Sequence, residues 1–490
     1  MVMLPPALRC LLRAAGILAT PASLVGAFLL AGLVMLAVEP PFVGADELYH
    51  WDRILQLSRG DLLAQPLGPN SWGGAIDKPS YDFSLFYFSK YQTGAPIPWQ
   101  EGWLLADRMS GLPPRLATVP FPSTATFSPL GYAPQTLGLS AARAAGRNIL
   151  IQFYAARLAN LCCYLFGVLW ISRLLPFGCR AFVLTACLPG MLHVATTLSA
   201  DPVGILAPSA LIALVLAARA AAPRRLPAAS AAMIFLTCLA CGLLKPGFVV
   251  FTAVVLLLPA ETCGGRRAGW LFRAACVGAG LGVTIAWNLS FPFVPGLYWG
   301  TGADPAAMLR RMLAAPADVA AVLFRTISDK GRHFWKDAFG RFGGHPPPYS
   351  FFIGYWSASW AGLVALILSA LAADRPARPN GFAAAWMAAL ALGYAFLMLV
   401  MFLVGFTNPG DAVVNGIQGR YFVPALILLT LALGAAPLPR RLPPGLAATA
   451  VLAALAIQVG VVGAASLEMG RHWTDTGSAA PSWHSRKPSL

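Results

Sequence analysis

Long apolar runs separated by shorter polar segments make up most of the chain. About 20 consecutive apolar residues are enough for a helix to cross a bilayer, so each run of this length predicts a spanning helix. Eleven runs have this character, at residues 20–38, 150–172, 181–198, 202–219, 229–245, 247–260, 270–288, 350–372, 382–405, 422–436 and 446–466. The pattern predicts an all-α polytopic membrane protein with a bundle of about 11 transmembrane helices, within a range of roughly 10–13.

The composition supports this class and excludes others. Of the 490 residues, 58% are hydrophobic and only 11% are charged, and so few charges cannot cover a surface that faces water. The net charge of +16 would suit a nucleic acid, but most Lys and Arg residues stand in short pairs between apolar runs. We therefore expect membrane lipids as partners and no nucleic acid.

The placement of charge predicts the orientation in the membrane. Basic residues cluster in every second connecting segment, which the positive-inside rule assigns to the cytoplasm: Arg9/Arg13, Arg173/Arg180, Arg219/Arg224/Arg225, Arg266/Arg267/Arg273, Arg375/Arg378 and Arg440/Arg441. Only Glu261 and Asp374 of the 19 acidic residues then fall on the cytoplasmic side, and all six histidines fall on the outer side. Longer outer loops explain part of this asymmetry without any function.

These assignments divide the chain into six parts. We expect a cytoplasmic N-terminus with the first helix (1–38), a large first periplasmic loop (39–149), helices 2–7 (150–288), a second periplasmic loop (289–349), helices 8–11 (350–466) and a periplasmic tail (467–490). The Ala- and Arg-rich, Lys-poor composition indicates a bacterial inner (plasma) membrane. The first periplasmic loop contains Pro, Gly, Trp and Tyr, and this composition predicts an ordered subdomain. In the second periplasmic loop, Asp304 can cap a helix that would lie along the membrane surface with Leu309 and Leu313 on its apolar side.

The first candidate for chemistry lies where the first span reaches the outer side. Asp46, Glu47 and His50 stand close together there. If Asp46 caps a helix, Glu47 and His50 project from one face, and the set could hold a divalent cation or supply a carboxylate as general base. Equally, Asp46 could be only the cap of an interfacial helix that displays Leu48 and Trp51.

The second candidate precedes the tenth predicted span. Within residues 415–424, Arg420 is an isolated guanidinium at the point where a helix enters the bilayer. Such a group suits bidentate binding of a lipid phosphate, and neighbouring glycines allow a close approach. From residue chemistry alone, an arginine that snorkels to the headgroups beside the Tyr421 anchor is the stronger interpretation.

Further charged residues recur on the predicted outer side. In segment 328–348, Arg332 and His333 stand among aromatic residues and glycines and could line a cleft for an anion or a sugar, although a solvated loop explains most of these charges. Asp201 and Lys245 stand at predicted helix ends, where a charge at headgroup depth is costly unless it is paired or hydrated. A helix cap or a tight hairpin is the alternative for both.

Taken together, these pieces resemble a bacterial membrane-protein family catalogued as domain of unknown function 2142, which belongs with the GT-C glycosyltransferases. The resemblance runs nearly end to end. Its elements are Asp46-Glu47-Leu-Tyr-His50, Ser128-Pro129-Leu-Gly-Tyr132-Ala-Pro134, Arg157-Leu158-Ala159-Asn160 and, most specifically, Gly416-Ile417-Gln418-Gly419-Arg420-Tyr421-Phe422-Val423-Pro424. Two departures are Ala45, where the family usually has Pro, and Gly344-His345-Pro346, where an element with a carboxylate is expected.

The resemblance implies a GT-C-like bundle that transfers a sugar from a polyprenyl-phosphate donor to a glycan, lipid or protein acceptor at the periplasmic face. Asp46 or Glu47 would serve as the base. Substrate and phosphate would meet Arg420, Gln418, Tyr421, Lys245, Arg332 and His333, supported by His50, Asp201, Tyr132 and Arg157. Metal dependence varies among GT-C enzymes, so a Mg²⁺ or Mn²⁺ ion on Asp46, Glu47 and His50 stays open.

Two other functions stay open at this stage. A transporter or flippase of lipid-linked glycans would need ionisable residues deep within the spans and broken helices near the midplane. The interiors of the predicted spans contain almost no such residues. A non-catalytic component of polysaccharide assembly would keep the fold without the chemistry, and the missing loop carboxylate fits that alternative.

Overall fold

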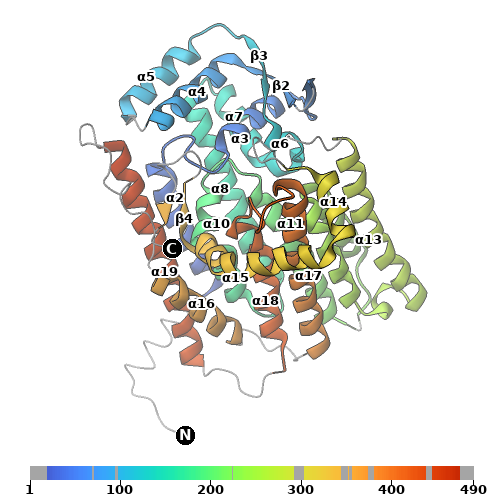
Figure 1. Ribbon diagram of the computed structural model, residues 1–490. Coiled ribbons are helices and arrows are strands. Elements are labelled where there is room, and N and C mark those ends of the chain that lie inside the picture. Colours follow the sequence, from blue (N-terminus) through green and yellow to red (C-terminus); the bar gives the residue numbers. More distant parts are fainter. Residues whose placement is uncertain are drawn as a thin grey trace, which may run out of the picture.

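The computed structural model describes residues 19–68, 71–93, 98–222, 224–291, 303–343, 351–352, 356–372, 380–437 and 444–474. A bundle of apolar helices carries a small subdomain on one end, which we call the capped end (Figure 1). Several residues named in the sequence-based predictions lie outside the described part of the chain: Arg9, Arg13, Asp374, Arg375, Arg378, Arg440, Arg441, Gly344, His345 and Pro346.

Long apolar helices confirm the predicted class. Within the described residues, six helices are long and apolar enough to cross a membrane: α2 (Pro21–Val38), α8 (Ile149–Leu174), α11 (Asp201–Ala220), α13 (Arg266–Leu289), α17 (Gly381–Phe406) and α19 (Pro444–Thr474). Shorter apolar helices are α12 (Ala228–Leu244), η2 (Pro246–Leu257), α16 (Trp356–Leu371) and α18 (Val423–Ala435), the last preceded by the single turn η4 (Gly419–Phe422). The protein is an all-α polytopic membrane protein.

Two apolar runs differ from the continuous helices expected for them. Run 181–198 forms two short helices, α9 (Cys179–Ala186) and α10 (Pro189–Ala195), because Pro189 has no N–H to continue the first helix and starts a new one instead. Run 247–260 forms the 3-10 helix η2, which is followed by the turn η3 (Ala260–Cys263). Helices α9 and α10 and most of η2 are buried among longer neighbours that complete the bundle.

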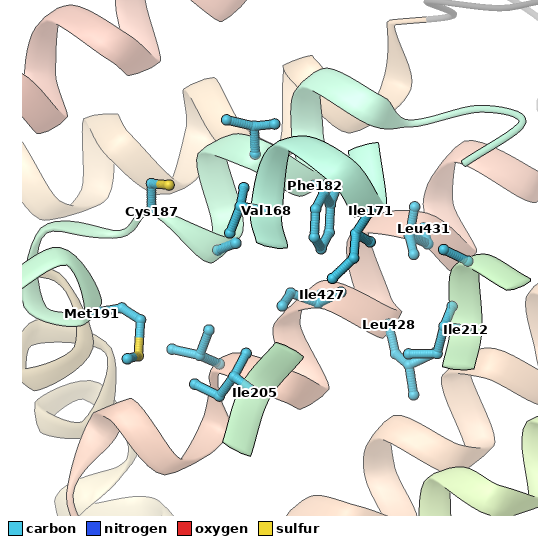
Figure 2. Packing of buried hydrophobic residues seen from close by; sticks show 14 of the residues in the cluster. Val168, Ile171, Phe182, Cys187, Met191, Ile205, Ile212, Ile427, Leu428 and Leu431 are labelled. Atoms are coloured by element: carbon cyan, nitrogen blue, oxygen red, sulfur yellow. The ribbon is translucent and has the colours of Figure 1, made fainter. Parts of the chain in front are cut away.

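The bundle core forms where α8, α9, α10, α11 and α18 meet. Figure 2 shows Phe182 of α9 beside Val168 and Ile171 of α8, with Ile427 of α18 and Ile205 of α11 closing the cluster. These side chains are at most 3% exposed. Burial on all sides is consistent with runs that are apolar around the whole helix rather than on one stripe.

The subdomain is built from residues 39–148. It contains the antiparallel sheet β1 (Gln65–Gly68), β2 (Ser71–Asp77) and β3 (Leu116–Pro120), and the helices α3 (Glu47–Leu57), α4 (Lys78–Thr93), α5 (Trp99–Ser110), α6 (Pro122–Ala125), η1 (Pro129–Tyr132) and α7 (Ala133–Ala144). Trp51 and Ile54 of α3 are fully buried in its core. The alternative of an interfacial helix that displays Trp51 is therefore wrong.

A helical arm runs across the bundle below the subdomain (Figure 1). It consists of α14 (Pro305–Ala314), which Asp304 caps by accepting a hydrogen bond from the Ala307 N–H at 3.0 Å, and α15 (Pro316–Gly340). The short strands β4 (Arg341–Phe342) and β5 (Phe351–Phe352) follow. Residues 328–340, considered above as part of a solvated loop, are the last turns of α15.

Candidate functional site

The segment that joins α2 to α3 ends in an unusual backbone conformation at Asp46. This residue has φ 58° and ψ 15°, the left-handed region that costs a non-glycine residue roughly 1–2 kcal/mol. Its carboxylate does not cap α3, is exposed, and makes no hydrogen bond or ion pair within the described part of the chain. An unpaired carboxylate held at a fixed place is available to accept a proton.

Glu47, the next residue, has the opposite environment. Its two oxygens accept hydrogen bonds from Arg157 Nε at 2.8 Å and Nη2 at 2.6 Å, and both side chains are fully buried. The Gly44 and Leu198 N–H groups donate to the same carboxylate at 3.1 and 3.0 Å. With four donors on two oxygens, Glu47 is saturated, so its geometry suits anchoring rather than proton transfer.

Arg157 also closes the segment that carries Asp46. Its Nη1 donates to the Glu39 carbonyl and its Nη2 to the Pro40 carbonyl, both at 2.9 Å. One side chain of α8 thus binds both the beginning and the end of residues 39–47. This clamp explains how the left-handed backbone at Asp46 is maintained.

Glu39 and His193 extend this buried cluster, although the sequence pattern predicted a role for neither. The Glu39 carboxylate is fully buried, lies 2.9 Å from His193 Nε2 and accepts a hydrogen bond from the Thr196 hydroxyl at 2.9 Å. Burial alone would raise the pKa of Glu39, but His193 and Arg157 outweigh it and lower this pKa. An ionisable residue inside predicted span 181–198 was the signal that could have found His193.

Asn160, one turn after Arg157 on α8, holds the segment that leads to α11. Its Nδ2 donates to the Thr197 carbonyl at 2.8 Å and to the Ser199 carbonyl at 3.3 Å. Gln135 Nε2 donates to Asn160 Oδ1 at 2.9 Å and to the same Ser199 carbonyl at 2.8 Å. The spacing Arg157-Leu-Ala-Asn160 therefore ties the Asp46 segment and the Asp201 segment to one helix face.

Asp201, Lys245 and Arg420 form an ion cluster at three helix ends of the capped end. Asp201 Oδ1 accepts from Lys245 Nζ at 2.5 Å, and Oδ2 accepts from Arg420 Nε at 2.9 Å. The side chains of the two cations are 20% and 12% exposed. Arg420 is therefore not the isolated, snorkelling guanidinium considered above, because a buried carboxylate fixes it at a defined position.

This cluster keeps capacity for an anion. Two cations share one directly paired carboxylate, and within the described residues neither Nη group of Arg420 is in an ion pair with another carboxylate. Tyr421 lies between the cations, with its ring centre 4.7 Å from Lys245 Nζ and 5.2 Å from Arg420 Cζ. A guanidinium and an ammonium held side by side are suited to oxygen atoms of a phosphate.

Asp46, which precedes α3, and His50, in the first turn of α3, interact electrostatically with the same cluster. The charge of Asp46 acts on Arg420, Tyr421 and His50, which places the two ends of the candidate site within electrostatic range of each other. His50 Nδ1 lies 2.7 Å from the Tyr132 hydroxyl, and burial lowers the pKa of His50 to about 4. His50 is therefore neutral near pH 7 and adds no positive charge to the site.

The described residues do not fit a divalent metal. Among them, no group of three or more His, Cys, Asp or Glu side chains is placed to hold one. Arg157 and two backbone N–H groups occupy the oxygens of Glu47, and the Nδ1 atom of His50 is engaged with Tyr132.

Comparison with known proteins gives a family. Residues 28–463 match the family described as Predicted membrane protein (DUF2142). The chain belongs to the DUF2142 family. No curated protein and no solved structure matches the chain. The match spans all the candidate residues above, and the family description states a membrane location without naming a reaction.

In this DUF2142 protein, most of the residues singled out from the sequence come together. The residues that converge at the capped end are Asp46, His50, Asp201, Lys245, Arg420 and Tyr421, with Tyr132 behind them. Glu47 and Arg157 form the anchor beneath Asp46. Gln418 starts the η4 turn that carries Arg420. Arg332 and His333 lie exposed on α15.

Proposed function

We propose that the protein is a membrane glycosyltransferase of the GT-C type. It would take a sugar from a polyprenyl-phosphate donor and pass it to an envelope glycan, lipid or protein at the periplasmic face of the inner membrane. The observation that carries the proposal is that the Arg420 and Lys245 cations, which share Asp201, and the exposed Asp46 carboxylate all act electrostatically on the buried His50, although they come from distant parts of the chain. A base and a phosphate site in one place are what such a transfer needs.

Arg420 and Lys245 would bind the phosphate of the donor. A lipid phosphate travels at the depth of the headgroups, and both cations sit at helix ends, where such a group would pass. As the bond between the sugar and the phosphate breaks, negative charge grows on the phosphate oxygen. Cations that Asp201 already holds in position stabilise this charge without reorganisation.

Asp46 would act as the base. The acceptor hydroxyl attacks the anomeric carbon, a new C–O bond forms, the bond to the phosphate oxygen breaks, and the hydroxyl proton goes to the Asp46 carboxylate. Polyprenyl phosphate leaves with the electron pair of the broken bond. Glu47 is better suited to hold Asp46 in place, because its own oxygens are saturated.

The positions of the charged groups favour surface chemistry over transport. Glu39 caps the end of α2, Asp201 begins α11, Lys245 ends α12 and Arg420 precedes α18. A transporter of lipid-linked glycans is expected to place such groups near the midplane of the spans instead. A non-catalytic role would leave the strain at Asp46 without a use.

Transfer of a labelled sugar from polyprenyl phosphate in proteoliposomes tests the proposal. Asp46→Asn and Arg420→Ala should each reduce transfer by at least about 100-fold, because general-base and charge-stabilising groups each contribute factors of this size. Arg325→Ala, at an exposed site on α15, is the matched control and should keep full activity. Full activity in both Asp46→Asn and Arg420→Ala would refute the proposal.

A further inference from the structure

The helical arm α14–α15 presents three distinct faces. On α15, Val319, Val322 and Thr326 recur every three or four residues and are buried against the protein. A second face carries exposed apolar residues at the same helical spacing, Ala317, Ala320, Phe324 and Ile327. A third face carries charges, Asp318, Arg325, Asp329, Arg332 and Lys336.

The exposed apolar face is too large to be explained by scattered surface residues. Phe324 is 75% exposed and Ile327 55%, and on α14 Leu309 and Leu313 are 51% and 86% exposed. Within the described part of the chain nothing covers them. A long apolar face of this kind marks a contact with an apolar partner.

We infer that this face rests in the interfacial layer of the bilayer, with α14 and α15 lying in the plane of the membrane. Helix α15 runs crosswise to α17 and α18 rather than along them (Figure 1), so its apolar face can turn toward the acyl chains while the charged face stays in water. Lys and Arg outnumber Asp by six to three on α14 and α15. The chemistry of the partner is therefore that of a surface with anionic headgroups.

The far end of the arm is joined to the turn that carries Arg420. The Gly419 N–H donates to the Asp337 carboxylate of α15. A Cβ added at Gly419 would lie 1.9 Å from the Phe334 carbonyl oxygen, so only glycine permits this contact. The membrane-resting arm thus ends on the turn that carries Arg420.

Photocrosslinking of the full chain in nanodiscs tests the inference. p-Benzoylphenylalanine replaces Leu313 or Phe324 on the apolar face, or Asp318 or Asp329 on the charged face, in discs of equal parts phosphatidylglycerol and phosphatidylcholine. All four side chains are exposed, so each can be replaced without disturbing buried packing. Mass spectrometry counts the lipid adducts at each position.

Lipid adducts at positions 313 and 324 should exceed those at 318 and 329 at least about fivefold, since only the apolar face lies among acyl chains. Phosphatidylglycerol should be enriched over phosphatidylcholine among the adducts. Equal yields at all four positions, or higher yields at 318 and 329, would overturn the in-plane placement. Adducts that match the disc composition would overturn the preference for anionic headgroups.

Discussion

Arg420 Nε lies 2.9 Å from Asp201 Oδ2, although 219 residues separate the two in the sequence. The same carboxylate holds Lys245 through its other oxygen. This arrangement fixes two cations at the capped end through a single counter-ion. It is the structural basis for proposing that a lipid phosphate binds there, and it explains why two charges can be tolerated at helix ends in a membrane protein.

The backbone at Asp46 predicts a difference between two small replacements. Asp46→Gly should be more stable than Asp46→Ala by about 1 kcal/mol, because only glycine adopts φ 58° without a Cβ penalty. Thermal unfolding of the purified variants in detergent measures this. Equal midpoints would show that the left-handed conformation is not maintained.

The buried pair of Glu47 and Arg157 predicts a large loss of stability. Arg157→Met leaves a fully buried carboxylate with two fewer hydrogen bonds and should cost about 3–5 kcal/mol. Lys78→Met, which removes the exposed bridge to Asp82, is the control and should cost less than about 1 kcal/mol. Similar losses in both variants would argue against the anchor described here.

His50 predicts a pH dependence with a definite sign. Burial lowers the pKa of His50 to about 4, below its value of about 6.5 in the unfolded chain. The folded state binds this proton less well than the unfolded chain does. The contribution of neutral His50 to the free energy of unfolding is therefore fully present above pH 6.5 and is lost as the pH falls through 4. It amounts to about 3 kcal/mol. His50→Gln should flatten the fall in unfolding midpoint over this interval, and an unchanged slope would contradict the assignment.

The close backbone contact at Gly419 predicts that the turn carrying Arg420 packs directly against α15. Gly419→Ala forces a Cβ against the Phe334 carbonyl and should lower stability by about 1–3 kcal/mol, because backbone must move to make room. Gly405→Ala on α17 meets nothing within 4 Å and serves as control. If the two variants unfold at the same temperature, the close contact at Gly419 is absent in solution.

Much of the architecture follows from the periodicity of the sequence, and much of the site does not. Long apolar runs such as 382–405 predicted their helices closely, because length and hydropathy decide whether a segment spans a bilayer. Run 181–198 was predicted as one span because its composition is uniform. Pro189 interrupts the helix because it lacks a backbone N–H. The hydropathy of the whole run does not reveal the effect of this one residue.

The sequence did not predict which charged residues at distant helix ends pair with one another. Asp201 and Lys245 were each predicted to be costly unless paired or hydrated, and Arg420 was predicted to be isolated, because which charge meets which depends on helix packing. Glu39 was overlooked for the same reason, because its partners His193 and Thr196 lie more than 150 residues away. From the sequence, Glu47 is an equal alternative to Asp46 as a base, whereas in the structure Arg157 and two backbone N–H groups saturate its carboxylate.

The affinity for polyprenyl phosphate, measured on the detergent-solubilised protein and its variants, tests the central claim most directly. If Arg420 clamps the phosphate and Asp46 acts only as base, Arg420→Ala should weaken binding by at least about tenfold, the loss expected for a charge-assisted bidentate contact. Asp46→Asn should bind as tightly as the wild type while it fails to transfer sugar. Unchanged affinity in Arg420→Ala would contradict the account.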